Sequence, residues 1–321
     1  MLKFIRGVGR NLLLILVIFA FTCSLAVAKN QTKPIRIILD WFVNPDHAPI
    51  FVAQQQGFFK KHGLKVTIIP PADPSDSGKL VAVGKADIAV TYQPQFMKSV
   101  ARGMPLVRIA TLIATPLDCL VTLKGGSIHK ISDLKGKRIG YSMAGTDDIM
   151  LQAMLKAHGL KLKDVKLINV HYGLTQALLA GQIDAFTGAM RNFEPLEIEL
   201  VGKQAQLFYP EENAVPIYDE LILITTKKEL HDPRLKSFIE AMQEGVIYLI
   251  NHPNSTWKIF VKNHPELNNQ LNKRAWLNTL PRFALRPGLL DQEHYKKYTK
   301  FLQKQGILKK KLNIEDYAVQ L

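Results

Sequence analysis

A run of polar and aromatic residues follows the first apolar strand of the sequence. The apolar residues 35–39 lead directly into Asp40 and Trp41, and Asn44 and His47 follow within eight residues. Strand ends in α/β folds open toward a crevice and are common ligand sites. A carboxylate, an indole, an amide and an imidazole could together stack and hydrogen-bond a small ring. The alternative is a turn in which Asp40 and Asn44 bond the backbone and Trp41 packs in the core.

A second candidate site lies in the loop 142–146, which joins the predicted strand 138–141 to the N-terminus of a predicted helix. Backbone N–H groups at such a terminus favour a carbonyl or anionic group. The loop lacks the glycine–lysine spacing of a phosphate-binding loop, and Asp147 and Asp148 disfavour a strongly anionic ligand. A neutral polar group of a ligand fits better at this loop. The candidate ligand-binding residues there are Ser142, Gly145 and Thr146.

The first 28 residues have the pattern of an export signal. Three basic residues accompany the apolar run 12–21, and Ala26-Val27-Ala28 is a small-x-small cleavage site. The run is shorter than a membrane span, which needs roughly 20 apolar residues. We therefore expect cleavage after Ala28 and a periplasmic protein. A lipid anchor at Cys23 and retention of the signal are the weaker alternatives.

The composition excludes several classes of site. Of the 2 cysteines, Cys119 alone lies outside the predicted signal, so the mature chain can form neither an internal disulfide nor a thiolate metal cluster. We expect Cys119 to be a buried, small apolar residue. The histidines are isolated and lack a second close ligand, so the sequence predicts no metal site.

The chain is strongly basic, with a formal net charge of +15, or about +12 once the three basic residues of the signal are removed. Export removes the chain from nucleic acid, so we expect no nucleic-acid partner whatever the charge. The lysines of residues 296–311 lack interleaved aromatic residues, which is typical of a solvated helix face.

The order of predicted elements occurs twice along the chain. In each half a strand leads through a helix, a glycine, a strand, a second helix and a second glycine to a third strand. The first half has strands at 35–39, 66–69 and 88–91 and helices at 49–62 and 79–83; the second has strands at 138–141, 165–170 and 185–188 and helices at 147–158 and 174–180.

The two halves also share a short phrase. Gly84-Lys85-Ala86-Asp87 is similar to Gly181-Gln182-Ile183-Asp184, 97 residues later. In each, the glycine ends a helix and the aspartate precedes a buried strand, so we expect both aspartates to be structural. The repetition predicts two α/β lobes with a cleft between them. The later strand 221–225 and helices 234–250 and 255–262 are expected to return to the first lobe. This gives a signal at 1–28, lobe 1 at 29–122 plus 220–321, and lobe 2 at 123–219.

These residues resemble the thiamine-pyrimidine-precursor family over roughly residues 35–272. One branch of that family contains substrate-binding proteins of bacterial ABC importers, and the other contains fungal hydroxymethylpyrimidine phosphate synthases. The most specific similarity lies at Asp40-Trp41 with Asn44-Pro45-Asp46-His47, and at Asn192-Phe193-Glu194 with Leu196 and Glu197. The resemblance implies a type II periplasmic-binding-protein fold, with two α/β lobes, a hinge and a ligand in the interlobe cleft.

The synthase branch carries residues that this chain lacks. It has a lysine and, four residues later, a histidine, where this chain has Thr91 and Gln95. It also has a cysteine-rich iron motif before a strand that matches residues 219–226, where no cysteine occurs. The binding-protein branch is therefore the better match, and it implies neither a catalytic residue nor a cofactor.

A pyrimidine precursor needs aromatic faces for its ring and hydrogen-bonding partners for its amine and ring nitrogens. Trp41 and Tyr92 follow strands and are the candidate stacking faces, although either could be a core aromatic. Glu194, next to the candidate Asn192, could accept from the amine; the alternative is an ordinary carboxylate on a helix surface. The retained histidine of the motif, His47, is either a ligand or structural.

Two classes of function remain. The first is a monomeric periplasmic receptor that delivers a formylaminopyrimidine or hydroxymethylpyrimidine to an ABC importer permease. The second is a pyrimidine phosphate synthase-like enzyme on the same fold. A receptor for another solute, such as an alkanesulfonate, is a third possibility, although such a site should display serine and arginine donors.

Overall fold

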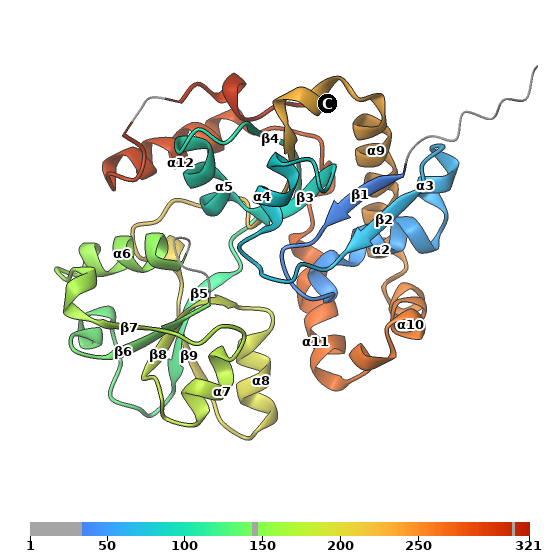
Figure 1. Cartoon of the computed structure of the whole chain (residues 1–321). Helices are drawn as coiled ribbons and strands as arrows, with labels where there is room; N and C mark the ends of the chain where they lie inside the picture. The colour runs from blue at the N-terminus through green and yellow to red at the C-terminus, as the bar shows by residue number, and fades with distance from the viewer. Residues whose placement is uncertain (1–33, 143–146, 310–311) are drawn as a thin grey trace, which may run out of the picture. The chain divides into compact units, whose positions relative to one another are not determined.

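The computed structural model describes residues 34–142, 147–309 and 312–321 (Figure 1). The predicted signal and the candidate site residues Gly145 and Thr146 lie outside the described residues. Within the described part of the chain, no helix is both long and apolar enough to cross a membrane. The described residues form two mixed α/β layers, each built on one five-stranded sheet.

The first sheet has the strand order β2-β1-β3-β10-β4. Strands β1, β2 and β3 are parallel, and β10 runs antiparallel to both β3 and β4. The bounds are β1 (Ile35–Ile38), β2 (Val66–Ile69), β3 (Ile88–Tyr92), β4 (Leu106–Ile113) and β10 (Leu221–Thr226).

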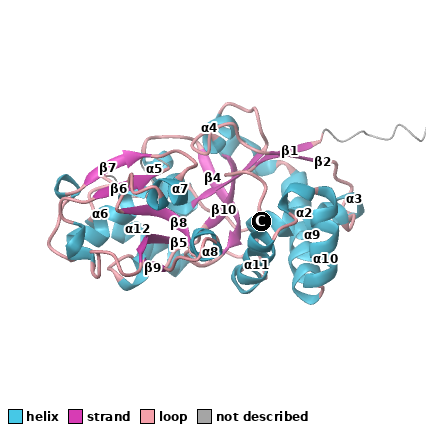
Figure 2. Ribbon diagram, turned by 90° about the horizontal axis from the view of Figure 1, so that it is seen from below, coloured by secondary structure: helices cyan, strands magenta, loops and turns pink. Residues whose placement is uncertain are grey.

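The second sheet has the order β7-β6-β8-β5-β9 and repeats this plan (Figure 2). Strands β6, β7 and β8 are parallel, and β5 runs antiparallel to β8 and β9. The bounds are β5 (Asp118–Leu123), β6 (Arg138–Tyr141), β7 (Lys166–Asn169), β8 (Ala185–Met190) and β9 (Ala205–Phe208). The duplicated order of elements predicted from the sequence is thus the duplicated topology of two sheets.

The chain passes between the sheets at residues 114–117 and again at residues 209–220. Strand β5 already belongs to the second sheet, so the first crossing lies earlier than residue 122, where the sequence analysis placed the end of lobe 1. Strand β10 belongs to the first sheet, as expected for a returning tail. We call the first sheet with its helices lobe 1, and the second sheet with its helices lobe 2.

The aspartates of the repeated phrase have matching roles in the two lobes. Asp87 Oδ2 accepts from the backbone N–H and Nε of Arg36 in β1, at 2.7 and 3.2 Å. Asp184 accepts from the backbone and guanidinium of Arg138 in β6, with the backbone bond at 2.8 Å. These contacts join the start of one strand to the turn before its neighbour, so both aspartates are structural, as predicted.

Alternation along the central strands places side chains on both faces of the first sheet, because successive residues of a strand point to opposite sides. Ile37 belongs to a core with α2 and α9, whereas Ile38 belongs to a second core with α4, α5 and α12. Parallel strands covered on both faces are typical of α/β folds. The helices of this lobe are α2 (Ala48–Gln55), α3 (Phe58–Lys61), α4 (Ser77–Ala82), α5 (Gln93–Ala101), α9 (Pro233–Asn251), α10 (Pro253–Asn263), α11 (Gln270–Thr279) and α12 (Gln292–Lys304).

The helix predicted over 49–62 is interrupted. Gly57 has φ +76°, and α2 ends before it while α3 begins after it. This left-handed conformation cannot continue an α-helix, and glycine adopts it without steric penalty.

Lobe 2 contains a third core and the helices α6 (Asp147–Ala157), α7 (Leu174–Leu179) and α8 (Glu194–Leu200). Cys119 lies in that core, fully buried, and burial raises the pKa of its thiol.

Candidate ligand-binding site

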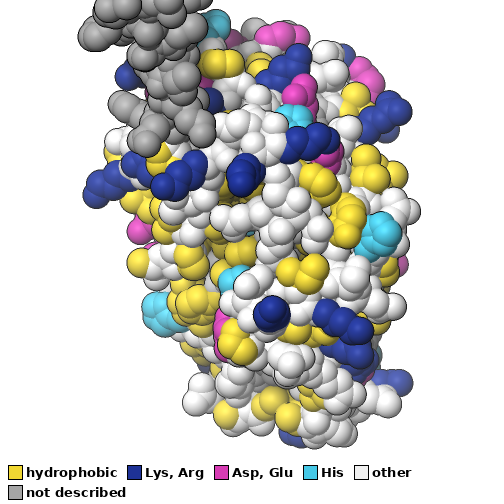
Figure 3. All heavy atoms as spheres, turned by 90° about the vertical axis from the view of Figure 1, so that its right-hand side faces the viewer, with side chains coloured by type: hydrophobic (Ala, Val, Ile, Leu, Met, Phe, Trp, Pro, Cys, Tyr) yellow, Lys and Arg dark blue, Asp and Glu magenta, His cyan; other side chains and the backbone are white. Residues whose placement is uncertain are grey.

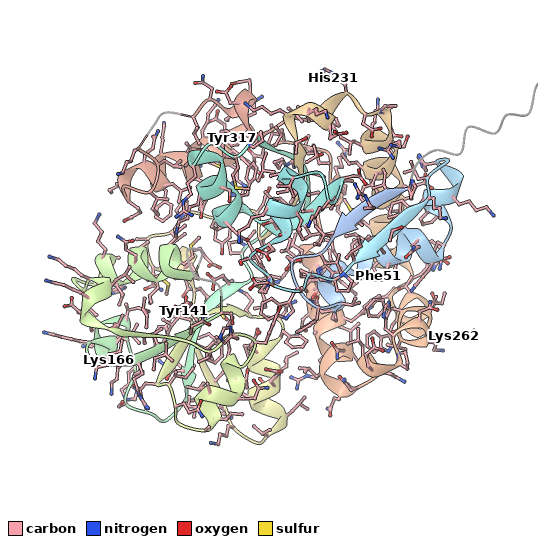
Figure 4. The ribbon with its side chains drawn as sticks, in the orientation of Figure 1. Phe51, Tyr141, Lys166, His231, Lys262 and Tyr317 are labelled. Atoms are coloured by element: carbon pink, nitrogen blue, oxygen red, sulfur yellow. The ribbon has the colours of Figure 1, made fainter. Side chains whose placement is uncertain are left out.

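A cavity of about 290 Å³ lies between the ends of strands from the two lobes. Lobe 1 contributes residues that follow β1, the last residue of β3 and residues that begin or precede β10. Lobe 2 contributes residues that follow β6 and β7, the end of β8, the start of β5 and the first turn of α8. β6 ends at Tyr141, which Figure 4 labels, and the next residue, Ser142, lines the cavity.

The structure places six of the ten predicted site residues in the cavity wall, namely Asp40, Trp41, Asn44, Tyr92, Ser142 and Glu194. His47 and Asn192 are buried behind the wall and are not lining residues. His47 hydrogen-bonds the lining residue Asp40, and Asn192 hydrogen-bonds Asp46 of the other lobe. Whether the six lining residues contact a ligand stays a prediction.

Asp40 is the centre of a buried hydrogen-bond network. Tyr92 donates its hydroxyl to Asp40 Oδ2 at 2.7 Å, and His47 Nε2 lies 2.9 Å from Asp40 Oδ1. The Asn44 backbone N–H donates to His47 Nδ1 at 3.4 Å, which places the ring proton on Nε2, so that Nε2 donates to Asp40. Asp40 therefore orients Tyr92, and His47 holds Asp40 from behind the cavity wall.

The Asn44 side chain caps the short helix η1 (Pro45–His47). Its Oδ1 accepts from the Asp46 backbone N–H at 2.8 Å, and its Nδ2 donates to the Phe42 carbonyl at 3.0 Å. This is the turn that the sequence analysis gave as the alternative for Asn44. Trp41, by contrast, is half-buried and lines the cavity.

Asn192 joins the two lobes. Its Nδ2 donates to Asp46 Oδ1 at 2.7 Å and to the Thr279 hydroxyl at 2.6 Å, and Thr279 in α11 also donates to Asp46 at 2.9 Å. All three residues are buried, and burial raises the pKa of Asp46. Asn192 follows β8 of lobe 2, whereas Asp46 precedes α2 of lobe 1, so this cluster crosses between the lobes.

Three aromatic side chains gather beside the cavity. Trp41 and Phe42 follow β1, and Tyr172 follows β7 in the other lobe. The rings of Trp41 and Tyr172 are 4.5 Å apart at 66°, and those of Phe42 and Tyr172 are 4.6 Å apart at 37°. Sequence reasoning missed Tyr172, although it follows the predicted strand 165–170 in the same way that Trp41 follows its strand.

Glu194 is the first residue of α8, and its carboxyl accepts the Met190 backbone N–H at 2.7 Å. Burial, and after it the charge of Glu197 one turn along the helix, raise the pKa of Glu194 to about 8. Burial also raises the pKa of Glu197, which lines the same cavity. At neutral pH, Glu194 therefore holds a proton for most of the time and presents both a donor and an acceptor.

Glu220 bridges the two crossings between the lobes. Its Oε2 accepts from the backbone N–H groups of Leu117 and Asp118, at 2.6 and 2.9 Å, and from the Tyr218 hydroxyl at 3.2 Å. Burial raises its pKa to about 7. Glu220 and Asp118 both line the cavity, and neither was predicted from the sequence.

The cavity wall is acidic. Six of its described residues are Asp or Glu, and none of the described lining residues is Lys, Arg or His. Arg191 directly follows the lining residue Met190 in the sequence. It pairs with Glu211 at 2.5 Å and donates to the carbonyls of Leu117 and Asp118. Within the described ranges, no cluster of three or more His, Cys, Asp or Glu residues is arranged to hold a metal ion.

The excess positive charge lies outside the cavity. On the face seen in Figure 3, lysine and arginine side chains are scattered among hydrophobic, uncharged and a few acidic side chains. Because the described lining residues include carboxyl groups but no Lys or Arg, the net charge of +15 is a poor guide to the ligand.

Comparison with solved structures identifies the fold. The alkanesulfonate-binding protein of Xanthomonas axonopodis pv. citri, solved with bound MOPS, is similar over 90% of this chain and 98% of its own, with a TM-score of 0.71 at 15% identity. A Candida albicans protein described as having the generic periplasmic binding protein fold covers 90% of this chain and 96% of its own, with a TM-score of 0.71 at 20% identity. The predicted periplasmic-binding-protein fold is confirmed.

Sequence relatives narrow the family. A thiamine biosynthesis protein of Haemophilus influenzae is 45% identical over 94% of this chain and 97% of its own length. The formylaminopyrimidine-binding protein of Halalkalibacterium halodurans is 28% identical over 80% of this chain and 79% of its own. A 4-amino-5-hydroxymethyl-2-methylpyrimidine phosphate synthase of Legionella pneumophila is 29% identical over 84% of this chain and 86% of its own length. The family model described as NMT1/THI5 like matches residues 44–256, and the chain belongs to this NMT1/THI5-like family.

Proposed function

We propose that this chain is the substrate-binding protein of an ABC importer, and that its ligand is a formylaminopyrimidine or hydroxymethylpyrimidine precursor of thiamine. The observation that carries the proposal is the cavity wall, which combines aromatic side chains with six carboxyl groups and has no cationic side chain among its described residues. A cavity of about 290 Å³ suits a single substituted ring, because pockets for drug-sized ligands begin at roughly 300 Å³.

Such a wall disfavours an anionic ligand. A sulfonate or phosphate in this cavity would find no cationic partner among the described lining residues, and any lining carboxyl that is ionised would repel it. Arg191 supplies no compensating charge, since its guanidinium is held by Glu211 and two backbone carbonyls. The alkanesulfonate alternative therefore receives no support from the chemistry of this cavity.

Glu194 suits one edge of an aminopyrimidine. That edge presents an amine, which donates, beside a ring nitrogen, which accepts. A carboxyl group with pKa about 8 holds a proton at neutral pH and can therefore donate to the nitrogen while accepting from the amine. Two parallel hydrogen bonds of this kind fix the orientation of the ring. Trp41, Tyr92 and Tyr172 provide the aromatic surface beside it.

The proposal includes binding without turnover. Thr91 and Gln95 hydrogen-bond each other at 3.2 Å and are absent from the lining residues. Threonine cannot form the imine that a lysine would form at that place. The only cysteine in the described residues, Cys119, is buried in a core. These features support a receptor in preference to the synthase, even though the family contains enzymes bearing that name.

The cellular setting follows from the same proposal. The signal-like pattern of residues 1–28 supports a periplasmic location, where the protein would act as a monomer and deliver its ligand to a membrane permease. The two crossings at 114–117 and 209–220 are the proposed hinge. Strands β5 and β10, which follow these two crossings, lie inside separate sheets.

Two experiments test the proposal. Native mass spectrometry of protein taken from the periplasm should show an adduct with the mass of an aminopyrimidine, because a tight receptor retains its ligand during purification. Incubation with pyridoxal phosphate and iron under air should release no hydroxymethylpyrimidine product. Release of that product, or imine absorbance on a lysine of the protein, would identify an enzyme instead.

A further inference from the structure

Two exposed aromatic side chains from different lobes meet at the cavity. Phe42 is 52% exposed and Tyr172 is 39% exposed, yet both line the cavity, and their ring centroids are 4.6 Å apart. Trp41 contacts the same tyrosine ring at 4.5 Å. Large aromatic residues that remain this exposed contribute little to a core, so their contact needs another explanation.

The loop that carries Tyr172 is held in an uncommon conformation. His171 has φ +50°, in the left-handed region that non-glycine residues rarely adopt. The Asn169 side chain accepts the His171 N–H at 2.9 Å, and the Ser142 hydroxyl donates to the His171 carbonyl. These bonds position the backbone beside Tyr172, from which its ring extends to contact Trp41 and Phe42.

Movement of the lobes apart would break the contact between Phe42 and Tyr172. Phe42 follows β1 of lobe 1, whereas Tyr172 follows β7 of lobe 2, so the pair separates whenever the lobes part. A contact that forms only after closure stabilises the closed state and slows release, while the association step precedes it and is unaffected. Core residues within one lobe cannot have this effect.

We propose that Phe42 and Tyr172 are an interlobe latch that sets how long the ligand remains in the cavity. The two rings join the lobes across the cavity and break contact when the lobes open. The kinetic part of this inference rests on the proposed function, because it needs a bound aminopyrimidine. The contact itself does not depend on which ligand binds.

The kinetic test uses formylaminopyrimidine as the probe, followed by stopped-flow association and displacement. Phe42→Ala and Tyr172→Ala should each raise the dissociation rate roughly twofold to tenfold, the range of an aromatic pair, with the association rate unchanged. The double variant should be no faster than the faster single variant, because both remove one interaction. Tyr172→Phe keeps the ring and should raise the dissociation rate less than Tyr172→Ala does.

Ile247→Ala is the matched control, since Ile247 is 47% exposed in α9 and is absent from the lining residues. It should leave both rates unchanged. Unaltered dissociation in Phe42→Ala would overturn the latch even if Tyr172→Ala released the probe faster, because Tyr172 would then act on the ligand alone. Effects of the two single variants that add fully in the double variant would overturn it as well.

A second arm separates the latch from the proposed ligand. A variant carrying both Phe42→Cys and Tyr172→Cys is treated with a short bismaleimide, with and without formylaminopyrimidine, and the linked species is measured by intact mass. The variants with one new cysteine are the controls. Linkage in the double variant supports the contact, and a wild-type protein that binds no pyrimidine would then contradict the proposed function alone. Absence of linkage under both conditions would overturn the latch whatever the ligand.

Discussion

The side-chain amide of Asn192 donates to the carboxylate of Asp46 at 2.7 Å, and this buried bond joins lobe 2 to lobe 1. Thr279 in α11 contacts both partners, so the cluster has three members from three separate parts of the chain. Asn192, which the family resemblance marked as ligand-binding, thus makes a contact between the lobes. The bond can exist only where the two lobes are together, which makes it a determinant of the closed state.

Asn192→Ala should therefore weaken binding of an aminopyrimidine. Truncation leaves the buried Asp46 carboxyl with one partner fewer, and an unsatisfied buried polar group costs about 1–3 kcal/mol. We expect the dissociation constant to rise roughly tenfold to a hundredfold. Calorimetric titration measures the change, with Asn263→Ala, an exposed asparagine of α10, as the control. Equal affinity in the wild type and Asn192→Ala would show that the cluster does not favour the closed state.

The affinity should depend on pH through Glu194. The complex holds one proton between this carboxyl and the ring nitrogen, and at pH 7 the empty site already holds it, because burial raises the pKa to about 8. Above pH 8 the proton has to be taken from solution, so affinity should fall by up to tenfold per pH unit. Calorimetry at pH 7, 8 and 9 checks this.

Glu194→Gln should remove that dependence. An amide cannot exchange the proton, but it can donate to the ring nitrogen and accept from the amine as the protonated carboxyl does, so binding at pH 7 should change little and should not fall above pH 8. A variant whose affinity still falls above pH 8 like the wild type would show that another group titrates. In that case Glu220, with a pKa of about 7, would be the next residue to replace.

The same carboxyl predicts a change in folding stability that needs no ligand. The pKa of Glu194 is about 8 when folded and near 4.5 when unfolded, so the folded state binds more protons between these values. Stability should therefore fall as pH rises from about 5 to 8. The free energy of unfolding of Glu194→Gln, taken relative to that of the wild type at the same pH, should be about 1–3 kcal/mol more favourable at pH 8 than at pH 5.

Thermal unfolding at the two pH values measures this gain. Glu212→Gln, at an exposed carboxylate of η4 (Pro210–Glu212), is the control and should shift equally at both. An equal shift for Glu194→Gln would mean that the Glu194 carboxyl is charged at neutral pH and that the proposed pairing with a ring nitrogen is wrong.

Trp41→Ala should weaken pyrimidine binding by about 1–3 kcal/mol, because the ring loses stacking area and Tyr172 loses a neighbour 4.5 Å away. Trp41→Phe keeps an aromatic face and should lose less. Quenching of tryptophan fluorescence by bound ligand should disappear in both variants, since Trp257 and Trp276 are buried in the core of lobe 1. Persistent quenching would place the ligand away from Trp41.

The sequence predicted much of the fold because its signals were local. Gly63, Gly84, Gly159 and Gly181 end helices with positive φ as expected, and strands 66–69 and 138–141 have the predicted bounds. The break at Gly57 was missed, because Gly57 lies within an otherwise helical pattern, although the chain turns there and α3 packs on α9. Pattern alone does not distinguish a tolerated glycine from a break.

The site was harder to predict. The rule that ligands meet the carboxyl ends of strands pointed to Asp40, Trp41, Tyr92 and Ser142, which line the cavity, but it applies to parallel strands. β5 and β10 run antiparallel, so their first residues reach the same edge: Asp118 pairs with Met190 at the end of β8, and Leu221 pairs with Tyr92 at the end of β3. Glu220 and Asp118 were therefore missed, because strand direction is a property of the sheet and is not visible in the sequence.

The central claim is that an acidic, aromatic cavity receives an aminopyrimidine and rejects an anion of similar size. Calorimetric titration of the wild-type protein with formylaminopyrimidine, hydroxymethylpyrimidine and the sulfonate MOPS, under one set of conditions at pH 7, tests it most directly. We predict one binding site for at least one of the two pyrimidines, with a micromolar or tighter dissociation constant, and no heat of binding for MOPS. Binding of MOPS in the absence of binding by either pyrimidine would contradict the account.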